Sequence, residues 1–189
     1  FVPVTRADRS GNFRGSVTAP GGWYELEVRV RAGRGLTLSS TVDRVGVGEV
    51  FLVVGHSVAQ GGDINLPGAT DERVNTVALG SNEQQRDYDR TANPEFLPEL
   101  RGSLFADRVK PAPFGHGTYF WAQFAQNIVE REGVPVLILN AAFGGTSLEH
   151  WAKSVRGEPF EHGFVKSSIG MPYVNVKNAL SKYAFETGL

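Results

Sequence analysis

Residues 50–57 read Val-Phe-Leu-Val-Val-Gly-His-Ser, and this stretch decides the fold class of the chain. An unbroken apolar run that ends in a glycine is typical of a central strand covered on both faces, as in parallel sheets. Residues 134–140, Val-Pro-Val-Leu-Ile-Leu-Asn, form a second such run. Between the two runs, residues 118–132 carry aromatic and aliphatic side chains at helical spacing. Strand, helix and strand in this order predict an α/β fold with a βαβ crossover and parallel strands.

The region between the first strand and this helix predicts little regular structure. Residues 61–117 are rich in Gly, Pro, Asn and Asp, and only residues 73–79 form a short apolar stretch. A loop of this length inside a compact domain is usually functional or an insertion. Residues 173–186 predict a last helix that stops at Gly188. The chain ends at Leu189, where the next strand is due, so we expect a domain truncated at its C-terminus.

The N-terminal part has a different character. Residues 1–48 predict a small β-rich, sandwich-like segment, which precedes the α/β domain at residues 49–189. Residues 23–31 alternate apolar and polar side chains, the pattern of a half-buried strand. We expect residues 12–17 to be its hairpin partner and residues 36–40 to form a third short strand.

Composition excludes several functional classes. With 41% hydrophobic and 21% charged residues, the chain has a globular composition. Its formal net charge is -1 and its positive charges are scattered, so we expect neither nucleic acid nor a membrane as a partner. The absence of cysteine excludes disulfides, thiolate metal sites and a cysteine nucleophile. The chain starts at Phe1 rather than Met, and we expect a secreted or periplasmic protein with a processed or truncated N-terminus.

Ser57 is the first candidate functional residue. It follows the first apolar run, and the carboxyl ends of buried parallel strands form the rim at which open α/β sheets bind ligands. Gly55 permits a tight turn before it, and the backbone N–H of Ser57 can point at a developing oxyanion. This pattern predicts a serine nucleophile, with an ordinary strand-to-loop turn and a surface serine as the alternative.

A second candidate segment follows the second apolar run. Residues 140–151 read Asn-Ala-Ala-Phe-Gly-Gly-Thr-Ser-Leu-Glu-His-Trp, and parallel strands would place Gly144 and Gly145 at the same rim as the serine. Glycines allow a close approach of the backbone to a ligand and present N–H donors. Thr146 or Ser147 is expected to cap a short helix. An ordinary glycine turn with a helix cap is the alternative.

Together the two segments resemble a known enzyme family. The Gly-x-Ser at 55–57 and the Gly-Gly-Thr-Ser-Leu-Glu-x-Trp at 144–151 are similar to the first two signature blocks of the SGNH hydrolases. The nearest branch is the sialate O-acetylesterase and acetylxylan esterase type of carbohydrate esterase, and the likeness runs over residues 45–189. The resemblance implies a flavodoxin-like, three-layer α/β/α fold with a parallel sheet.

The resemblance also implies an activity and its residues. Ser57 would be the nucleophile of an esterase that removes O-acetyl groups from carbohydrate, sialic acid or plant polysaccharide, through an acyl-enzyme. The backbone N–H groups of Ser57 and Gly144 would form part of the oxyanion hole. Gly145 and Thr146 would bind the substrate. No metal and no cofactor are implied.

The chain departs from the family pattern in three places. His56 stands where the family has Gln, and Val58 stands where it has Asn. The family takes a third oxyanion donor from a Gln-Gly-Glu-Ser block and its base from a late Asp-x-x-His, and neither occurs here. Because a serine hydroxyl is a poor nucleophile without a base, we expect the remaining catalytic residues on a C-terminal segment or a separate chain. This chain alone would then be inactive.

The four histidines are weaker candidates. His56 is expected to point off the opposite side of the turn from Ser57. His116 and His150 are placed so that they can reach the rim of the pocket, and His162 lies in a loop. None has the spacing of a zinc site.

Two other functions stay open. Gly-His-Ser-Val-Ala at 55–59 approximates the Gly-x-Ser-x-Gly elbow of α/β-hydrolases, but Gly and Pro follow where that fold needs a helix. The other alternative is a non-catalytic carbohydrate-binding or structural module on an esterase-like scaffold. The β-rich N-terminal segment and the missing acid/base residues favour this second alternative.

Overall fold

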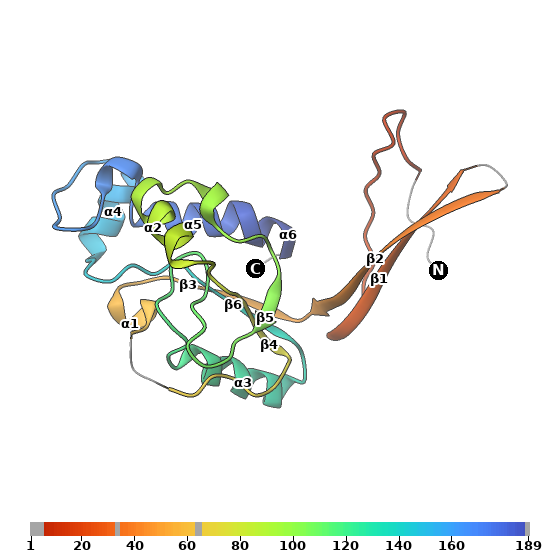
Figure 1. The fold of residues 1–189 in the computed structure, drawn as a ribbon, viewed down its shortest axis with the longest axis horizontal. Coiled ribbons are helices and arrows are strands. Elements are labelled where there is room, and N and C mark those ends of the chain that lie inside the picture. Colours follow the sequence, from red (N-terminus) through yellow and green to blue (C-terminus); the bar gives the residue numbers. More distant parts are fainter. Residues whose placement is uncertain (1–5, 33–34, 63–65, 188–189) are drawn as a thin grey trace. The chain divides into compact units, whose positions relative to one another are not determined.

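The computed structural model describes residues 6–32, 35–62 and 66–187 (Figure 1). By its internal contacts the chain divides into two compact units, residues 1–47 and residues 48–189.

The N-terminal unit is built on one β-hairpin. β1 (Gly22–Ala32) pairs antiparallel with β2 (Leu36–Val47), with Leu26 opposite Val42 and Val30 opposite Leu38. The prediction that residues 12–17 pair with the first strand is wrong, since they form no strand. The third strand predicted at 36–40 is instead the partner and extends to Val47. β1 ends at Ala32 and β2 begins at Leu36, and so short a separation in sequence makes this pairing entropically cheap.

The alternation predicted for β1 is present, and it places apolar side chains on one face of the hairpin. Cross-strand pairs such as Val30 and Leu38 put their side chains on the same face of a two-stranded ribbon. Several of these side chains are exposed: Tyr24, Leu26, Val30, Leu38 and Val42. The alternation in the sequence therefore identifies which side chains share a face of the hairpin.

The second unit is built on a four-stranded sheet. Its strands are β3 (Glu49–Val53), β4 (Val74–Val77), β5 (Gly102–Leu104) and β6 (Val136–Asn140), in the order β3-β6-β4-β5. β3 and β4 run parallel to β6, which confirms parallel pairing of the two apolar runs. β5 runs antiparallel to β4, so the sheet is mixed and not wholly parallel as predicted.

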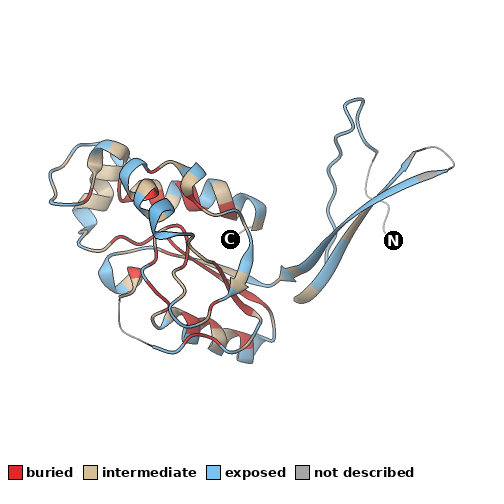
Figure 2. Ribbon diagram, viewed as in Figure 1, coloured by how far each residue is buried: buried red, intermediate tan, exposed pale blue. Residues whose placement is uncertain are grey.

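Helices lie on both faces of this sheet (Figures 1 and 2). On one face α3 (Trp121–Glu132) packs its buried alanines against a cluster that includes Val74 and Ile138. On the other face, Val77 and Leu139 belong to a second cluster with Tyr88. Neighbouring side chains of a strand point to opposite faces, so one strand such as β6 supplies both clusters. The architecture is therefore α/β.

The predicted helices are present with changed ends. The helix predicted over 118–132 is α3, and Gly133 caps it in the left-handed region at φ 73, as predicted. The helix predicted over 173–186 consists of α5 (Tyr173–Ala179), a π-helical turn over Leu180–Ala184 and α6 (Phe185–Thr187). The predicted stop at Gly188 lies outside the described residues.

The prediction of an almost unbroken loop over 61–117 is wrong. This region contains β5, a 3₁₀ turn at Pro94–Phe96 and the ten-residue helix α2 (Asn82–Thr91). α2 buries only Tyr88, so its sequence lacks the apolar periodicity of an amphipathic helix. A reciprocal capping box between Ser81 and Gln84 begins the helix. That capping box was the available sequence signal.

Candidate active site

Ser57 lies at the carboxyl end of β3, where the strand turns into the short helix α1 (Ser57–Gln60). Gly55 makes this turn at φ +150, and a Cβ there would lie 2.9 Å from the Cβ of Ala59. The turn therefore requires glycine, as the sequence predicts. The side chain of Ser57 is exposed and lines a pocket.

His56 faces the serine, and the prediction that it points off the opposite side is wrong. Its Nδ1 lies 3.4 Å from Ser57 Oγ and accepts a long hydrogen bond of 3.5 Å from the N–H of Val58. His56 is the N-cap of α1, and an N-cap side chain turns back over the first helical N–H groups. This geometry brings a ring nitrogen to the hydroxyl.

The glycine segment reaches the serine from β6. The N–H of Phe143 donates to the carbonyl of Gly55 over 2.9 Å, which joins the turn after β6 to the turn after β3. A Cβ on Gly144 would lie 3.5 Å from the Cβ of Ser57. The structure thus brings Ser57 and Gly144 together at one edge of the sheet. This is the placement expected from two parallel strands.

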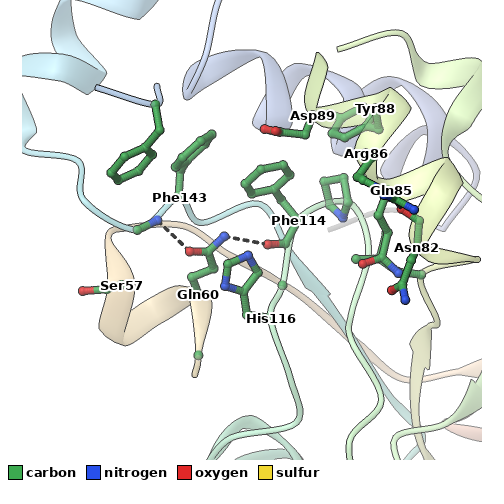
Figure 3. A pocket seen from close by; sticks show the side chains of 16 residues that line it. Ser57, Gln60, Asn82, Gln85, Arg86, Tyr88, Asp89, Phe114, His116 and Phe143 are labelled. Atoms are coloured by element: carbon green, nitrogen blue, oxygen red, sulfur yellow. Dashed lines mark hydrogen bonds between the residues drawn. The ribbon is translucent and has the colours of Figure 1, made fainter. Parts of the chain in front are cut away.

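The N–H of Gly144 already has a partner. It donates to Oε1 of Gln60 over 2.7 Å, and Nε2 of Gln60 donates to the carbonyl of Phe114 over 3.0 Å (Figure 3). Gln60 is 3% exposed. Gln60 is not predicted from the sequence, where its one signal is a glutamine three positions after the serine.

Gly145 and Thr146 shape the glycine segment. Gly145 has φ +73, and a Cβ there would lie 2.4 Å from the ring of Phe164. The hydroxyl of Thr146 donates to the carbonyl of Phe143 over 2.6 Å and accepts from the indole of Trp151 over 3.0 Å. Neither Gly145 nor Thr146 is among the residues that line the pocket. Both hold the segment in place.

The helix cap predicted after the two glycines is present. Ser147 is the N-cap of α4 (Leu148–Arg156), and its Oγ accepts the N–H of His150 over 3.4 Å. In return, Nδ1 of His150 accepts the N–H of Ser147 over 3.1 Å. Of the two caps expected, Thr146 or Ser147, the structure selects the second.

A pocket of about 820 Å³ begins at Ser57 and Gly144. One of its walls is α2, whose side chains at spacing i, i+3, i+4 and i+7 share one helix face. These residues are Asn82, Gln85, Arg86 and Asp89. Figure 3 shows Ser57 and Gln60 on one side of the pocket, with Asn82, Gln85 and Arg86 on the other. The sequence does not predict this wall, because it predicts a loop where α2 lies.

Charges on the α2 wall are partly compensated. Nζ of Lys166 lies 3.5 Å from the carboxylate of Asp89 and donates to its main-chain carbonyl over 3.0 Å. Nε of Arg86 donates to the carbonyl of Asn82 over 3.2 Å, which holds the guanidinium along the helix. The wall thus offers amide, guanidinium and carboxylate groups to a polar ligand.

Three phenylalanines form the apolar part of the pocket. The rings of Phe114 and Phe143 stack with centroids 4.6 Å apart, and those of Phe143 and Phe164 stack at 6.3 Å. All three residues line the pocket. They form a continuous aromatic row beside the α2 wall.

Tyr88 also lines the pocket, with its ring centroid 6.2 Å from that of Phe114. Its hydroxyl donates to Oδ1 of Asn175 over 3.0 Å and accepts from Nδ2 of Asn178 over 3.0 Å. Burial of the phenol raises the pKa of Tyr88 to about 12. The residue is therefore neutral at physiological pH and serves to hold α2 against α5.

The other histidines have separate places. His116 lines the pocket, so its predicted reach to the pocket is confirmed. His150 does not line the pocket, and the prediction that it reaches the rim is wrong, because its Nδ1 is used in the cap of α4. Nδ1 of His162 accepts two backbone N–H groups, and its Nε2 lies 3.0 Å from the carbonyl of Gly145.

The described part of the chain, residues 6–32, 35–62 and 66–187, holds neither a cluster of metal ligands nor a membrane-spanning helix. In these residues no group of three or more His, Asp or Glu side chains is arranged to hold a metal ion. Within the same residues, every helix is too short or too polar to span a bilayer.

Comparison with solved structures yields distant neighbours, one of which is described below. No protein-family model matches the chain, and no curated protein matches it. A solved structure of a carbohydrate acetylesterase from Xanthomonas citri is similar to this chain, with a TM-score of 0.43 and 26% sequence identity. The match covers 80% of this chain and 34% of the esterase. The chain thus spans about a third of the length of that protein.

Proposed function

We propose that the protein is a serine esterase that removes acetyl groups from carbohydrate, with Ser57 as the nucleophile. One observation carries this proposal: an exposed serine hydroxyl, contacted by a histidine nitrogen at 3.4 Å, stands beside Gly144 at the mouth of a pocket. A nucleophile with a base in reach and N–H groups nearby is the arrangement that acyl transfer requires.

The proposed reaction has two steps. Ser57 Oγ attacks the carbonyl carbon of the acetyl ester as its proton passes to a base, and the sugar hydroxyl leaves with a proton from that base. Water then attacks the acetyl-serine, which releases acetate and restores the hydroxyl. In both steps the negative charge on the carbonyl oxygen is stabilised by N–H groups, for which we propose Ser57 and Gly144.

Two sources of the base follow from the sequence and the geometry. Nδ1 of His56 contacts the nucleophile in this chain. An Asp-x-x-His segment, which this sequence does not contain, is the second source. In that case the full protein would supply the base, and His56 would only orient the hydroxyl.

The lining of the pocket supports a carbohydrate as the alcohol part of the ester. Sugar rings present C–H groups that pack on aromatic faces and hydroxyls that bond to amides and charged groups. The aromatic row of Phe114, Phe143 and Phe164 lies beside the polar α2 wall in one pocket. The volume of about 820 Å³ is in the range of small-ligand sites.

The alternative functions make different use of the same pocket. An α/β-hydrolase elbow runs from the serine into a long helix, whereas α1 ends after four residues. A non-catalytic carbohydrate-binding module would keep the α2 wall and the aromatic row without any need for a reactive serine. Only a test of the hydroxyl separates that module from the esterase.

The test is covalent labelling of the full-length natural protein with a fluorophosphonate probe, together with hydrolysis of p-nitrophenyl acetate. We expect labelling and turnover in the wild type and in the matched control Ser16→Ala, an exposed serine of the N-terminal unit. Ser57→Ala should lose the label and at least about 10⁴-fold in kcat. An unlabelled wild type that still binds saccharide in calorimetry would establish the binding module instead.

A further inference from the structure

We infer that Gln60 is a positioning residue of this site, which fixes the peptide of Gly144 relative to the hydroxyl of Ser57. This inference rests on the proposed esterase function. The side chain of Gln60 makes its hydrogen bonds to the backbone of Gly144 and Phe114, and it acts through the backbone of the glycine segment.

Gln60 lies on the same short helix, α1, as Ser57. Ser57 and Gln60 are one helical turn apart, so their side chains leave the same face of the helix. Two hydrogen bonds anchor this helix, since the carbonyl of Ala59 accepts from the side chain of Asn140 over 2.9 Å and from the indole of Trp121 over 2.8 Å. Serine and glutamine therefore stand on one anchored turn, with a fixed distance between them.

Both polar atoms of the Gln60 side chain and its main-chain carbonyl have hydrogen-bond partners. Its Oε1 accepts from Gly144 and its Nε2 donates to Phe114, while its main-chain carbonyl accepts the N–H of His116 over 3.0 Å. All three partners line the pocket. One buried side chain thus joins the nucleophile helix, the segment around residue 114 and the glycine segment (Figure 3).

Gly144 approaches the Gln60 side chain closely. A Cβ on this residue would lie 2.8 Å from Oε1 of Gln60, closer than real Cβ contacts. The amide therefore reaches the peptide only because residue 144 is glycine. The two residue types depend on each other, although they lie 84 positions apart.

These contacts have a consequence for the oxyanion. The N–H of Gly144 is directed at Gln60, so a reacting oxygen would share it with Oε1 in a three-centre hydrogen bond. The position of the amide then sets the direction in which Gly144 donates. Without the amide the segment can shift relative to Ser57, and a misplacement of about 1 Å can cost on the order of 10²-fold in rate.

Two variants of the full-length protein test this inference. Gln60→Met has a similar length and no polar atom for either partner, and we expect kcat to fall about 10²-fold while KM changes little. In Gln60→Glu the carboxylate can still accept from Gly144 but cannot donate to Phe114. Its protonated form has one donor and one acceptor and reproduces both bonds. Its kcat relative to wild type should therefore rise as the pH falls.

Matched controls separate positioning from folding. Gln123 is an exposed glutamine of α3, and Gln123→Met and Gln123→Glu should keep the wild-type kcat at every pH. Thermal unfolding of each variant shows whether it is folded at the assay temperature. If Gln60→Met does not fold, the pH profile of kcat for Gln60→Glu decides alone, because loss of folded protein alone would not make kcat per labelled site rise in acid.

The outcomes distinguish the two proposals. If the fluorophosphonate probe does not label the wild type, both the proposed esterase function and this inference are wrong. A labelled, active wild type whose Gln60 variants keep the wild-type kcat overturns the positioning role alone. A change confined to KM, or a kcat ratio for Gln60→Glu that does not vary with pH, overturns it as well.

Discussion

The side-chain amide of Asn140 donates a hydrogen bond of 2.9 Å to the carbonyl of Ala59, 81 positions earlier in the chain. Oδ1 of the same side chain accepts the N–H of Ala142 over 3.0 Å. Asn140 is fully buried at the end of β6. It therefore joins the end of α1 to the start of the glycine segment, and both turns of the site depend on it.

Asn140→Leu keeps the side-chain size but leaves the buried N–H of Ala142 without its acceptor. We expect the free energy of unfolding to fall by about 1–3 kcal/mol, the cost of an unsatisfied buried group. Urea unfolding measures the change. Asn127→Leu, at an exposed position of α3, should stay within about 0.5 kcal/mol of wild type. Equal stabilities of the two variants would contradict a structural role for Asn140.

Gly48→Ala should destabilise the sheet. A Cβ at residue 48 would lie 2.0 Å from the carbonyl oxygen of Pro135, a backbone atom that cannot move without disturbing the β3–β6 pairing. Overpacking of this kind costs about 1–3 kcal/mol or more. The matched control is Gly62→Ala, where a Cβ would meet nothing within 4 Å. A thermal midpoint of Gly48→Ala that equals that of the control would contradict this close approach.

Gly144→Ala should lower activity more than stability. Its Cβ would meet Oε1 of Gln60 at 2.8 Å, and the end of a flexible side chain can move away where a backbone atom cannot. We expect the displaced amide to lower kcat about 10²-fold in the full-length protein, with the fold retained. Steady-state kinetics and circular dichroism measure the two effects. Gly35→Ala, with nothing within 4 Å of its Cβ, serves as the control, and equal kcat in both variants would contradict the prediction.

Tyr88→Phe should change how stability depends on alkaline pH. Burial raises the pKa of Tyr88 to about 12, whereas an unfolded phenol ionises near pH 10. The folded state therefore holds its proton longer, so this contribution to stability is present below about pH 10 and is lost as the pH rises towards 12. Urea unfolding between about pH 8 and 12 should show a shallower decline for the variant. Parallel declines would contradict the buried, neutral phenol.

Tyr88→Phe also removes two buried hydrogen bonds. Asn175 loses its donor and Asn178 loses one acceptor, for a cost of about 1–3 kcal/mol at neutral pH. The effect at neutral pH is thus separable from the change in slope above about pH 10.

Two strands of the sheet are predictable because each has a clear local sequence pattern. Residues 50–54 and 134–139 are apolar throughout, a pattern typical of a segment that is buried on both sides. Their parallel pairing follows from the intervening helix α3, whose end at Gly133 was also predictable. The adjacency of Ser57 and Gly144 then follows from the common rim of parallel strands.

Elements with weak local signals were missed. α2 is polar on nearly every side, so no periodicity marks it, although it forms a wall of the pocket. The pairing of β1 with β2 was assigned to the wrong segment, because alternation identifies a strand but does not identify its partner.

The sequence by itself determined the α/β class, the parallel pair of apolar strands, and the meeting of Ser57 with the glycine segment. The apolar runs identify the strands and the glycines identify the turns that follow them, and both are local features of the sequence. Only the tertiary structure decided that Gln60 holds Gly144, that Asn140 holds Ala59, and that His56 faces the serine. The first two contacts join residues that are tens of positions apart in the sequence, and the third depends on the side-chain rotamer of an N-cap. Sequence periodicity does not encode such contacts, because the packing between elements selects the partners.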